Sequence, residues 1–466
     1  MKYILSIILF FLLAGSLFAQ NEQDQVIFKA MQDEMQRSKD QLMLPGMQKP
    51  YYLSYTLGRT RQFEVVGALG GITNFYESPW SAVGGVQMFL GDYDRNNDVN
   101  YACASIQAGM PEQADYDVIR RNFWLGSDAM YKWSLQAGAM KDAYLKANPK
   151  TAEEAAVKDQ QKVAAVTRIE EPKTAYTIDR AKLEGIVEEL SAIFKGYKDI
   201  YDSSVAITGQ EMEVYKSTTD GVVLKEPLRY ASLVVSAYVM TEDGVRIDDA
   251  YSVLVARPDD LPSLDELKKG VKVFADNLIK LKNAPAITEY YAGPVLLEDG
   301  ACSSVFISNF LKRGALFAYR KPDTDRAQSV KTLDARLGMK IVDNRVSIKN
   351  YSSLDKYNGV PLLGAYNIDA EGVVPAKEMT LVDHGIFKSM LNGCIPTLYA
   401  PQSTGSSRFL LSSSNGMFAT APGTIHIEVE KGTKPEKMKS ALIKAAKEEG
   451  LKYAYIVRSL AGKASR

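Results

Sequence analysis

The stretch GPVLLEDGACSSVF, residues 293–306, decides how the second half of the chain is interpreted. Its apolar run VLL (295–297) is typical of a buried strand, and the small residues after it are typical of the first turns of a helix. Glu298, Asp299 and Cys302 stand at the junction. Acids and a thiol at such a junction raise the question of whether they form an active site.

The composition is that of an ordinary globular protein. The 466 residues exceed the size at which one hydrophobic core stops growing, so we expect two or three domains. The chain is 46% hydrophobic and 24% charged, with 56 basic and 56 acidic residues. The formal net charge is zero, so the chain has no excess of positive charge to attract nucleic acid or an anionic membrane. We therefore expect no nucleic-acid partner.

The first residues, MKYILSIILFFLLAGSLFAQ, predict a secretory signal peptide over residues 1–19. One Lys precedes an apolar run over residues 3–13, and small residues follow near Ala19. The run is shorter than the ~20 residues needed to span a bilayer. We therefore expect a secreted or periplasmic protein with no membrane span after cleavage.

The three cysteines, Cys103, Cys302 and Cys394, allow at most one disulfide, so they predict no disulfide framework. The apolar surroundings of Cys302 favour a small buried hydrophobe over a reactive thiol.

The hydrophobic pattern predicts an α+β fold. An N-terminal α+β region (20–285) is expected to hold a helix (24–42), an antiparallel sheet (about 51–110) and a helical part (116–200) that includes the Ala-rich stretch 151–166. Strands (203–256) and a helix (263–283) follow, the helix with Ser263 as N-cap and Glu266 completing a capping box. The exit Asn-Ala-Pro (283–285) predicts a boundary before a C-terminal β-rich domain (286–466), in which a last helix (435–449) precedes a strand (452–457).

The segment GDYDRNND, residues 91–98, has the alternation of a calcium loop. Its candidate ligands are Asp92, Asp94, Asn96 and Asp98. An EF-hand requires Gly at the sixth position and Glu at the twelfth, where this chain has Asn97 and Cys103. We therefore expect a polar turn.

Neither histidine predicts a catalytic site. His384 stands in the turn VDHGI and His426 in the strand TIHIEVE, without metal-ligand spacing. No nucleophile is placed near either one, and no glycine-rich phosphate loop occurs in the sequence.

At the junction itself, Glu298 and Cys302 are four residues apart and would share a helix face, which makes them weak candidates for a metal site. Zinc prefers nitrogen and sulfur ligands and usually has three from the protein at a catalytic site. A helix N-terminus also stabilises acids that have no catalytic role. Helix capping by Glu298 and Asp299 is therefore favoured, and no cofactor is expected in this chain.

Three segments resemble the TldD/PmbA family, whose members were named modulators of DNA gyrase and are regarded as metallopeptidases. They are VGGVQMFLGDYDRNND (83–98), GPVLLEDGACSSVFISNFLKRGALFA (293–318) and YNIDAEGVVPAKEMTLVDHGIFKSML (366–391). The similarity is distributed over residues 52–457, and the resemblance implies a TldD/PmbA-type C-terminal domain. The chain ends where further strands of that domain are expected, which a truncated sequence would explain.

In catalytic members the strand-to-helix element carries His-Glu-x-x-x-His, two zinc ligands and a Glu that activates water. The resemblance places Glu298 at the first His, Asp299 at the Glu and Ser303 at the second His. A carboxylate and a hydroxyl then stand where two imidazole ligands are expected, so most of the ligands that zinc prefers are missing. Cys394 does not align with the family's third ligand, a late Cys. The resemblance therefore implies a member of the non-catalytic type, and whether the chain is an enzyme stays open.

Non-catalytic members of the family pair with a catalytic subunit and enclose a chamber that admits unfolded or small peptides. The resemblance implies a catalytic TldD-like partner or a homo-oligomer, with zinc held in the partner subunit. Two alternatives remain. One is an active metallopeptidase whose zinc has atypical ligands, and the other is a peptide-binding module of the cell envelope.

Overall fold

A computed structural model describes residues 22–99, 104–285, 287, 289–311, 315–324, 333–410, 417–458 and 460. The expected signal peptide and Cys103 lie outside these residues, and the side chains of residues 104–109 and of Asp299 are not described. None of the described helices is long and apolar enough to cross a membrane.

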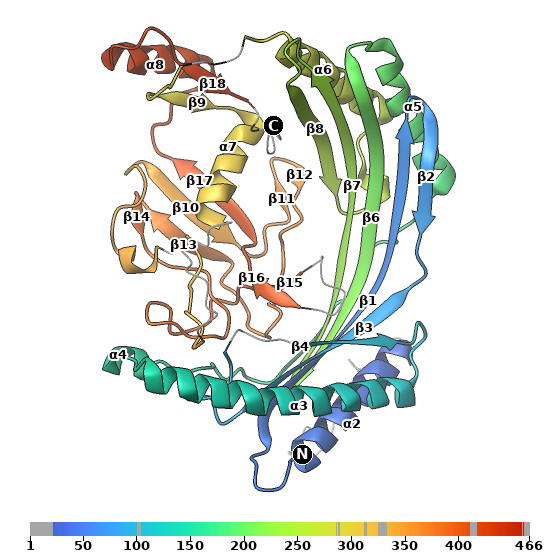
Figure 1. Ribbon diagram of the computed structural model, residues 1–466, viewed down its shortest axis with the longest axis vertical. Helices are drawn as coiled ribbons and strands as arrows, with labels where there is room; N and C mark the ends of the chain where they lie inside the picture. Colours follow the sequence, from blue (N-terminus) through green and yellow to red (C-terminus); the bar gives the residue numbers. More distant parts are fainter. Residues whose placement is uncertain are drawn as a thin grey trace, which may run out of the picture.

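The N-terminal half is built on a curved eight-stranded sheet (Figure 1). Along the sheet the order is β4-β3-β1-β6-β7-β5, with β2 paired to β1 and β8 paired to β7. Only the β5–β7 pair is parallel among these described pairings. The strands are β1 (Pro50–Ala68), β2 (Gly71–Glu77), β3 (Ser81–Leu90), β4 (Ala104–Met110), β5 (Val166–Ile169), β6 (Ile200–Thr218), β7 (Val222–Met240) and β8 (Arg246–Val255).

Helices cover one face of this sheet and form two cores with it. The first core contains α2 (Glu22–Gln41) and α3 (Tyr116–Ala147), and the second contains α5 (Arg180–Ala192) and α6 (Leu264–Lys282). Tyr55 belongs to the first core and Val65 to the second. Because side chains alternate along a strand and these two are ten residues apart on β1, both helix pairs lie on the same face.

The capping box predicted for α6 is confirmed. The Ser263 side chain accepts a hydrogen bond from Glu266 N, and the Glu266 carboxylate accepts one from Ser263 N. Two orphan amides at the start of the helix are thereby satisfied.

The prediction that residues 116–200 are helical throughout is wrong for the middle of this segment. After α3 only a single turn, α4 (Ala152–Ala155), is helical, and β5 follows. The amides of residues 159–161 donate to carbonyls of other segments: Asp159 to Asp94 (3.1 Å), Gln160 to Tyr93 (3.0 Å) and Gln161 to Cys394 (2.8 Å). These long-range bonds replace the helical ones, so tertiary contacts outweigh the helix propensity of the Ala-rich stretch.

The C-terminal half holds a four-stranded sheet of order β14-β13-β10-β17 and a parallel pair, β9–β18. The elements are β9 (Val295–Leu297), α7 (Asp299–Phe306), a π-helix η3 (Ile307–Leu311), β10 (Val346–Tyr351), β11 (Lys356–Tyr357), β12 (Val360–Pro361), β13 (Glu378–Asp383), β14 (Ile386–Phe387), β15 (Ser407–Phe409), β16 (Phe418–Thr420), β17 (Thr424–Val429), α8 (Pro435–Glu448) and β18 (Tyr455–Val457). Together with the large sheet, they confirm the α+β class. The division into domains at residue 285 stays a prediction.

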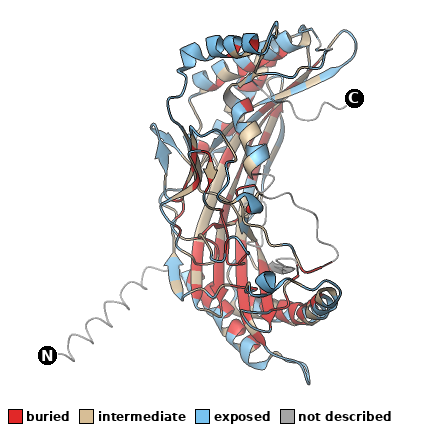
Figure 2. Ribbon diagram, turned by 90° about the vertical axis from the view of Figure 1, so that its left-hand side faces the viewer, coloured by how far each residue is buried: buried red, intermediate tan, exposed pale blue. Residues whose placement is uncertain are grey.

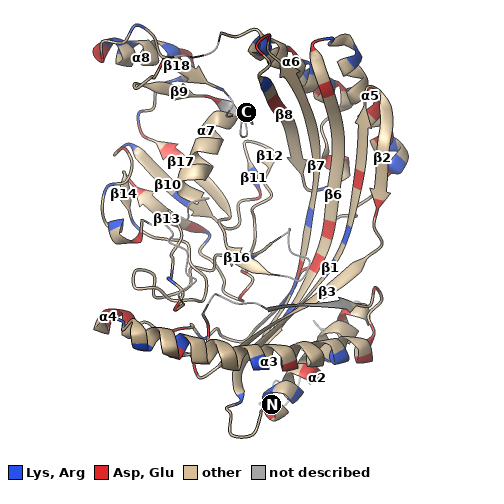
Figure 3. Ribbon diagram, viewed as in Figure 1, with Lys and Arg blue, Asp and Glu red and all other residues tan. Residues whose placement is uncertain are grey.

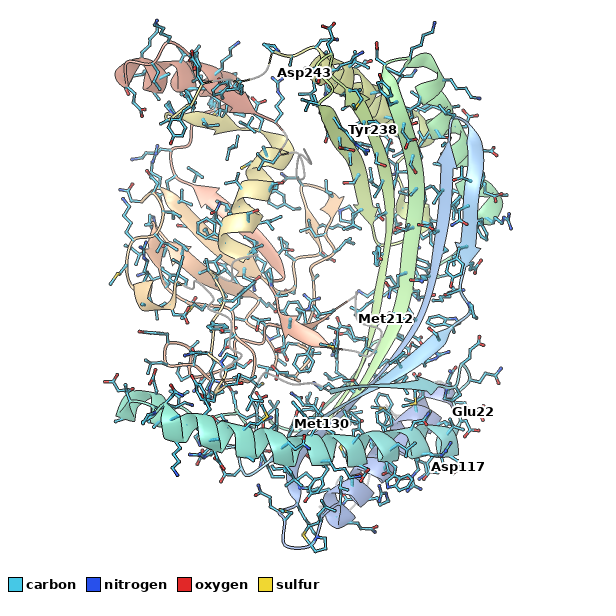
Figure 4. All side chains as sticks on the ribbon, in the orientation of Figure 1. Glu22, Asp117, Met130, Met212, Tyr238 and Asp243 are labelled. Atoms are coloured by element: carbon cyan, nitrogen blue, oxygen red, sulfur yellow. The ribbon has the colours of Figure 1, made fainter. Side chains whose placement is uncertain are left out.

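The C-terminal half packs on the second face of the large sheet. Met212 and Val214 of β6 form a small core with Ala370 and Phe409. Figure 4 shows Met212 on the side of β6 that faces β15 and β16. In Figure 2 buried residues gather in this lower part of the long strands, while the upper part around α8 is mostly exposed or intermediate. The two halves therefore meet through buried residues at this end of the large sheet.

Candidate functional site

The strand-to-helix junction forms as predicted, but its acid does not cap the helix. Glu298 is the N-cap residue of α7, and its side chain makes no capping hydrogen bond. Its backbone N–H donates to Val457 of β18 (2.9 Å), and its carboxylate accepts from Nε of Arg458 (2.9 Å). Pairing of β9 with β18 therefore brings a base to the acid.

The prediction that Cys302 is buried is wrong. Cys302 is exposed, and so is Ser303, whereas Ala301 is fully buried. Successive helical residues are turned by about 100°, so only Ala301 on this turn points inward. A small alanine suffices for the contact, and the thiol is left in solvent.

The junction does not fit a zinc ion. Glu298 is engaged by Arg458, and Ser303 offers a hydroxyl, a poor zinc ligand. Among the described residues no three His, Cys, Asp or Glu side chains are grouped so that they could hold a metal.

The calcium-like segment is a polar turn. Asp92 Oδ1 accepts hydrogen bonds from the amides of Asp94 (2.9 Å) and Arg95 (2.8 Å). The carboxylate is thereby used to hold the backbone of the turn.

The two histidines lie at separate places in the C-terminal sheet, and the backbone N–H of His384 donates to the Ser347 hydroxyl (3.0 Å). His384 has a left-handed backbone (φ 46°) between β13 and β14, and its ring contacts Asp383 (2.7 Å) and Glu430 (3.0 Å). Hydrogen bonds that the protonated ring donates to Glu430 and Asp383 raise the pKa of His384. His426 on β17 lies against the rings of Tyr351 and Tyr357.

A cleft of about 1650 Å³ is the candidate site in this part of the molecule. It lies between the large sheet and loops of the C-terminal half. Its lining comes from β5 and the segment after it (167–174), β7 (224–230), the end of β8 and the residues after it (254–257), the loop residues 353–368, and β15 (408–409). None of the motifs in the sequence predicted this site.

One wall of the cleft contains a strand segment with an unpaired side. Residues 226–230 of β7 pair with β6, but β5 ends opposite Lys225 and β8 ends opposite Ala231, so neither strand pairs with the segment between them. Pro227, which has no N–H to donate, lies in this gap, as prolines in sheets do where a strand edge is free. The Tyr230 carbonyl at the end of this segment already accepts a hydrogen bond from the Tyr176 hydroxyl (2.6 Å), so an extended peptide can add through main-chain hydrogen bonds only beside residues 226–229.

Glu226 and Arg408 place opposite charges in the cleft. Their side chains are mostly buried and approach to 3.9 Å. Burial raises the pKa of Glu226 to about 7, although the positive charge of Arg408 opposes the shift. Arg408 stacks on the Tyr366 ring (3.8 Å) and donates to the Gly364 carbonyl (2.9 Å), so its guanidinium is held in place.

Lys225, next to the unpaired segment, is held by the buried Asp24 and the exposed Glu171. Its Nζ lies 2.7 Å from Asp24 of α2 and 2.7 Å from Glu171. Tyr215 donates to the other oxygen of Asp24 (2.7 Å). Through this network α2 fixes the position of β7 at the cleft wall.

The turn Asp-Ala-Glu-Gly (369–372), which lies in the third of the resembling segments, fixes the opposite wall. Asp369 accepts hydrogen bonds from the amides of Glu371 (2.9 Å), Val373 (2.8 Å) and Ser407 (3.1 Å). Burial and the charge of Glu371 nevertheless raise its pKa. Gly372 has φ 92°, and a Cβ there would lie 2.8 Å from Val222 of β7. The turn therefore docks residues 366–368 against the large sheet.

Comparisons with solved structures identify the fold. A proposed modulator of a DNA gyrase from Thermotoga maritima superposes with a TM-score of 0.52 at 14% identity, over 82% of this chain and 74% of that chain. A proposed modulator of DNA gyrase from Bacteroides thetaiotaomicron gives 0.53 at 12% identity, over 88% and 78%. TldE from Thermococcus kodakarensis gives 0.49 at 13% identity, over 87% and 78%.

The protein is therefore an α+β protein with the architecture of the DNA gyrase modulators. The resemblance of the sequence to the TldD/PmbA family is confirmed at the level of the fold. No family model and no curated protein matches the chain.

Proposed function

We propose that this chain is an exported, non-catalytic subunit of a TldD/PmbA-type peptidase complex that holds unfolded or small peptides. The observation that carries the proposal is the set of side chains at the strand-to-helix junction. Glu298 and Ser303 stand where the resemblance expects imidazoles, and Arg458 neutralises Glu298. Export is proposed from the signal-like residues 1–19.

The cleft supports the peptide-holding part of the proposal. A strand edge offers main-chain hydrogen bonds to any sequence, which suits a site for varied peptides. Leu254 and Leu363, both exposed, lie among the cleft residues and offer apolar contacts to side chains of a bound peptide. Figure 3 shows acids and bases along β6 and β7, so the sheet that borders the cleft carries both signs of charge.

The first experiment measures metal content and peptidase activity of the purified mature chain. We expect less than stoichiometric zinc and no cleavage of an unfolded protein, and we expect co-purification from its native host with a relative that carries an intact His-Glu-x-x-x-His. Stoichiometric zinc together with cleavage that Asp299→Ala abolishes would overturn the proposal in favour of the atypical metallopeptidase.

The second experiment measures binding of a fluorescent, unstructured peptide by anisotropy. Leu254→Arg and Leu363→Arg are expected to weaken binding about tenfold or more, because each places a bulky charge in the cleft. Val273→Arg on the exposed face of α6, outside the cleft lining, is the matched control and leaves binding unchanged. If all three variants bound the peptide as tightly as wild type, peptides would have to bind outside the cleft.

A peptide-binding module of the envelope is the second candidate function, and the cleft favours it. Recovery of bound peptide from the native host with no partner protein would support this function over the subunit of a complex.

A further inference from the structure

The free edge of β7 in the cleft is short and is closed at one end by the chain itself. β5 pairs with β7 as far as Ile169 opposite Lys225, and the amide of Glu170 then donates to the Lys225 carbonyl (3.0 Å). The edge next to Lys225 is therefore occupied. A strand that adds beside residues 226–229 has room for about four residues, and it must end or turn away beside Glu226.

Glu226 faces the cleft at this end of the edge. It lies opposite Val214 of β6, which belongs to the small core between the two halves. Opposite residues of an antiparallel pair share one face of the sheet. Met212 lies on the same face two residues from Val214, and Figure 4 shows it on the side of β6 that faces β15 and β16. The Glu226 side chain is therefore directed toward the C-terminal half, and it is 17% exposed in the cleft lining.

The Glu226 carboxylate accepts no hydrogen bond from the side chains that the structure describes around it. Its ion-pair partner is Arg408, and the Nη2 and Oε1 atoms are 3.9 Å apart, beyond hydrogen-bond distance. Arg408 is held there because its guanidinium stacks on the Tyr366 ring and donates to the Gly364 carbonyl. Since an ionised carboxylate can accept about four hydrogen bonds, this one has capacity for a ligand that donates them.

The surroundings of Glu226 carry more acid than base. Besides Arg408, the charged groups that act on its pKa include Glu170, on the segment after β5, and Asp369, on the turn of the opposite wall. Arg168 pairs with Glu170 (3.2 Å). Burial and the two acids raise the pKa of Glu226 to about 7, although Arg408 opposes the shift. A ligand with a positive charge and N–H donors is the kind that such a carboxylate stabilises.

We propose that Glu226 binds the amino-terminal ammonium of the peptide that the cleft holds. The amino terminus then lies where the free edge ends, and the peptide runs from there along residues 226–229, parallel to β7 and in line with β5. A lysine side chain carries the same ammonium group, but the end of the edge favours a chain terminus. The inference rests on the proposed function, because it names the end of a held peptide that the cleft recognises.

Competition against a fluorescent peptide, measured by anisotropy, tests which group is recognised. The competitors share one sequence without lysine and have free ends, an acetylated amino end or an amidated carboxyl end. We expect acetylation to raise the dissociation constant at least tenfold, because the charge-assisted hydrogen bonds are lost, and amidation to leave it unchanged. Equal binding of the acetylated and free peptides would overturn the proposal. Weakening by amidation alone would overturn it too, since the carboxyl end would then be the one recognised.

A fourth competitor separates the two sources of an ammonium group. It has an acetylated amino end and one added lysine, and we expect it to bind as weakly as the acetylated peptide without lysine. Binding as tight as that of the free peptide would assign the site to lysine side chains and overturn the terminal assignment.

Glu226→Gln tests the residue, because it keeps the size of the side chain and removes its charge. We expect the variant to bind the free peptide as weakly as wild type binds the acetylated one, and to bind the acetylated peptide as wild type does. Glu242→Gln, in an exposed turn outside the cleft lining, is the matched control and retains the full preference. A preference for the free amino terminus that survives Glu226→Gln would overturn the role of Glu226.

The pH profile distinguishes recognition of charge from a change of shape. Binding requires an ionised Glu226, with a pKa of about 7, and a protonated amine, with a pKa of ~8. Affinity for the free peptide should therefore be highest between these values and about fivefold lower near pH 5.5, while the acetylated peptide shows no such maximum. The same profile for both peptides would overturn the proposal. If wild type bound no peptide at all, the peptide-holding function would fail as well, whereas binding without preference for the free amine contradicts this inference alone.

Discussion

Glu298 and Arg458 form an ion pair, with Nε and Oε2 2.9 Å apart, that joins the start of α7 to the end of β18. The pair is possible because β9 and β18 are parallel neighbours, so the residues that follow each strand leave the sheet at the same edge. The acid at the first position of the family motif therefore has a structural partner about 160 residues away along the chain.

Removal of this ion pair is expected to cost little stability. Arg458 is 74% exposed, and exposed pairs typically contribute at most ~1 kcal/mol. Arg458→Ala should therefore lower the free energy of unfolding by less than ~1 kcal/mol, measured by urea denaturation. A larger loss would mean that the pair is shielded from solvent, for instance by a partner subunit.

Substitution of Lys225 should lower the stability of the protein far more than substitution of Arg458. Lys225 and Asp24 are 2% and 1% exposed, and loss of one partner leaves the other charge buried and uncompensated. We expect Lys225→Met to lower the free energy of unfolding by about 3 kcal/mol. The control is Lys29→Met, since Lys29 makes an exposed pair with Asp33 on the same helix as Asp24. Similar losses for the two variants would contradict the buried network.

The sequence predicted elements whose formation depends on local signals. The capping box at Ser263 and the period of α6 are properties of one short segment, and both are confirmed. The stretch 151–166 has an equally good start, with a capping box at Thr151, but its amides bond to distant carbonyls. The local composition contains no information about those distant carbonyls, so the helix predicted from it was too long.

The candidate site was harder to predict for the same reason. The cleft depends on where β5 and β8 each end along β7, which is a matter of strand register. The one local signal was Pro227 inside a long strand pattern, which indicates an edge. The burial of Cys302 was predicted from apolar neighbours in sequence, but helical geometry pointed Ala301 inward instead.

The cysteines should differ in reactivity. Cys302 is exposed, whereas Cys394 is buried, and burial together with the charge of Glu371 raises the pKa of its thiol. Because the thiolate is the reactive form, a thiol reagent should label Cys302 in the folded protein and Cys394 only after unfolding. The measurement is absorbance of released chromophore from a Cys103→Ser background. Cys302→Ser should abolish the labelling of the folded protein, and rapid labelling that survives it would contradict the burial of Cys394.

Glu226 should make stability fall as pH rises. Its pKa is about 7 in the folded protein, above its ordinary value of 4.5, so the folded state binds the proton more tightly than the unfolded state. Its contribution is therefore fully present below about pH 4.5 and is lost as pH rises toward 7. Glu226→Gln removes this loss of stability. Between pH 5 and pH 8, the free energy of unfolding of the variant should therefore rise relative to that of wild type by on the order of 1–3 kcal/mol.

Urea denaturation at the two pH values measures this difference, and Glu242→Gln in an exposed turn is the control, because a solvated acid contributes no such dependence. Arg408 reduces this difference in stability. Its positive charge attracts the ionised Glu226 carboxylate, and the glutamine of the variant lacks that attraction. The sign still follows from burial, which is the larger cause of the shift. If Glu226→Gln were equally stable relative to wild type at both pH values, Glu226 would have to be ionised and solvated in the cleft.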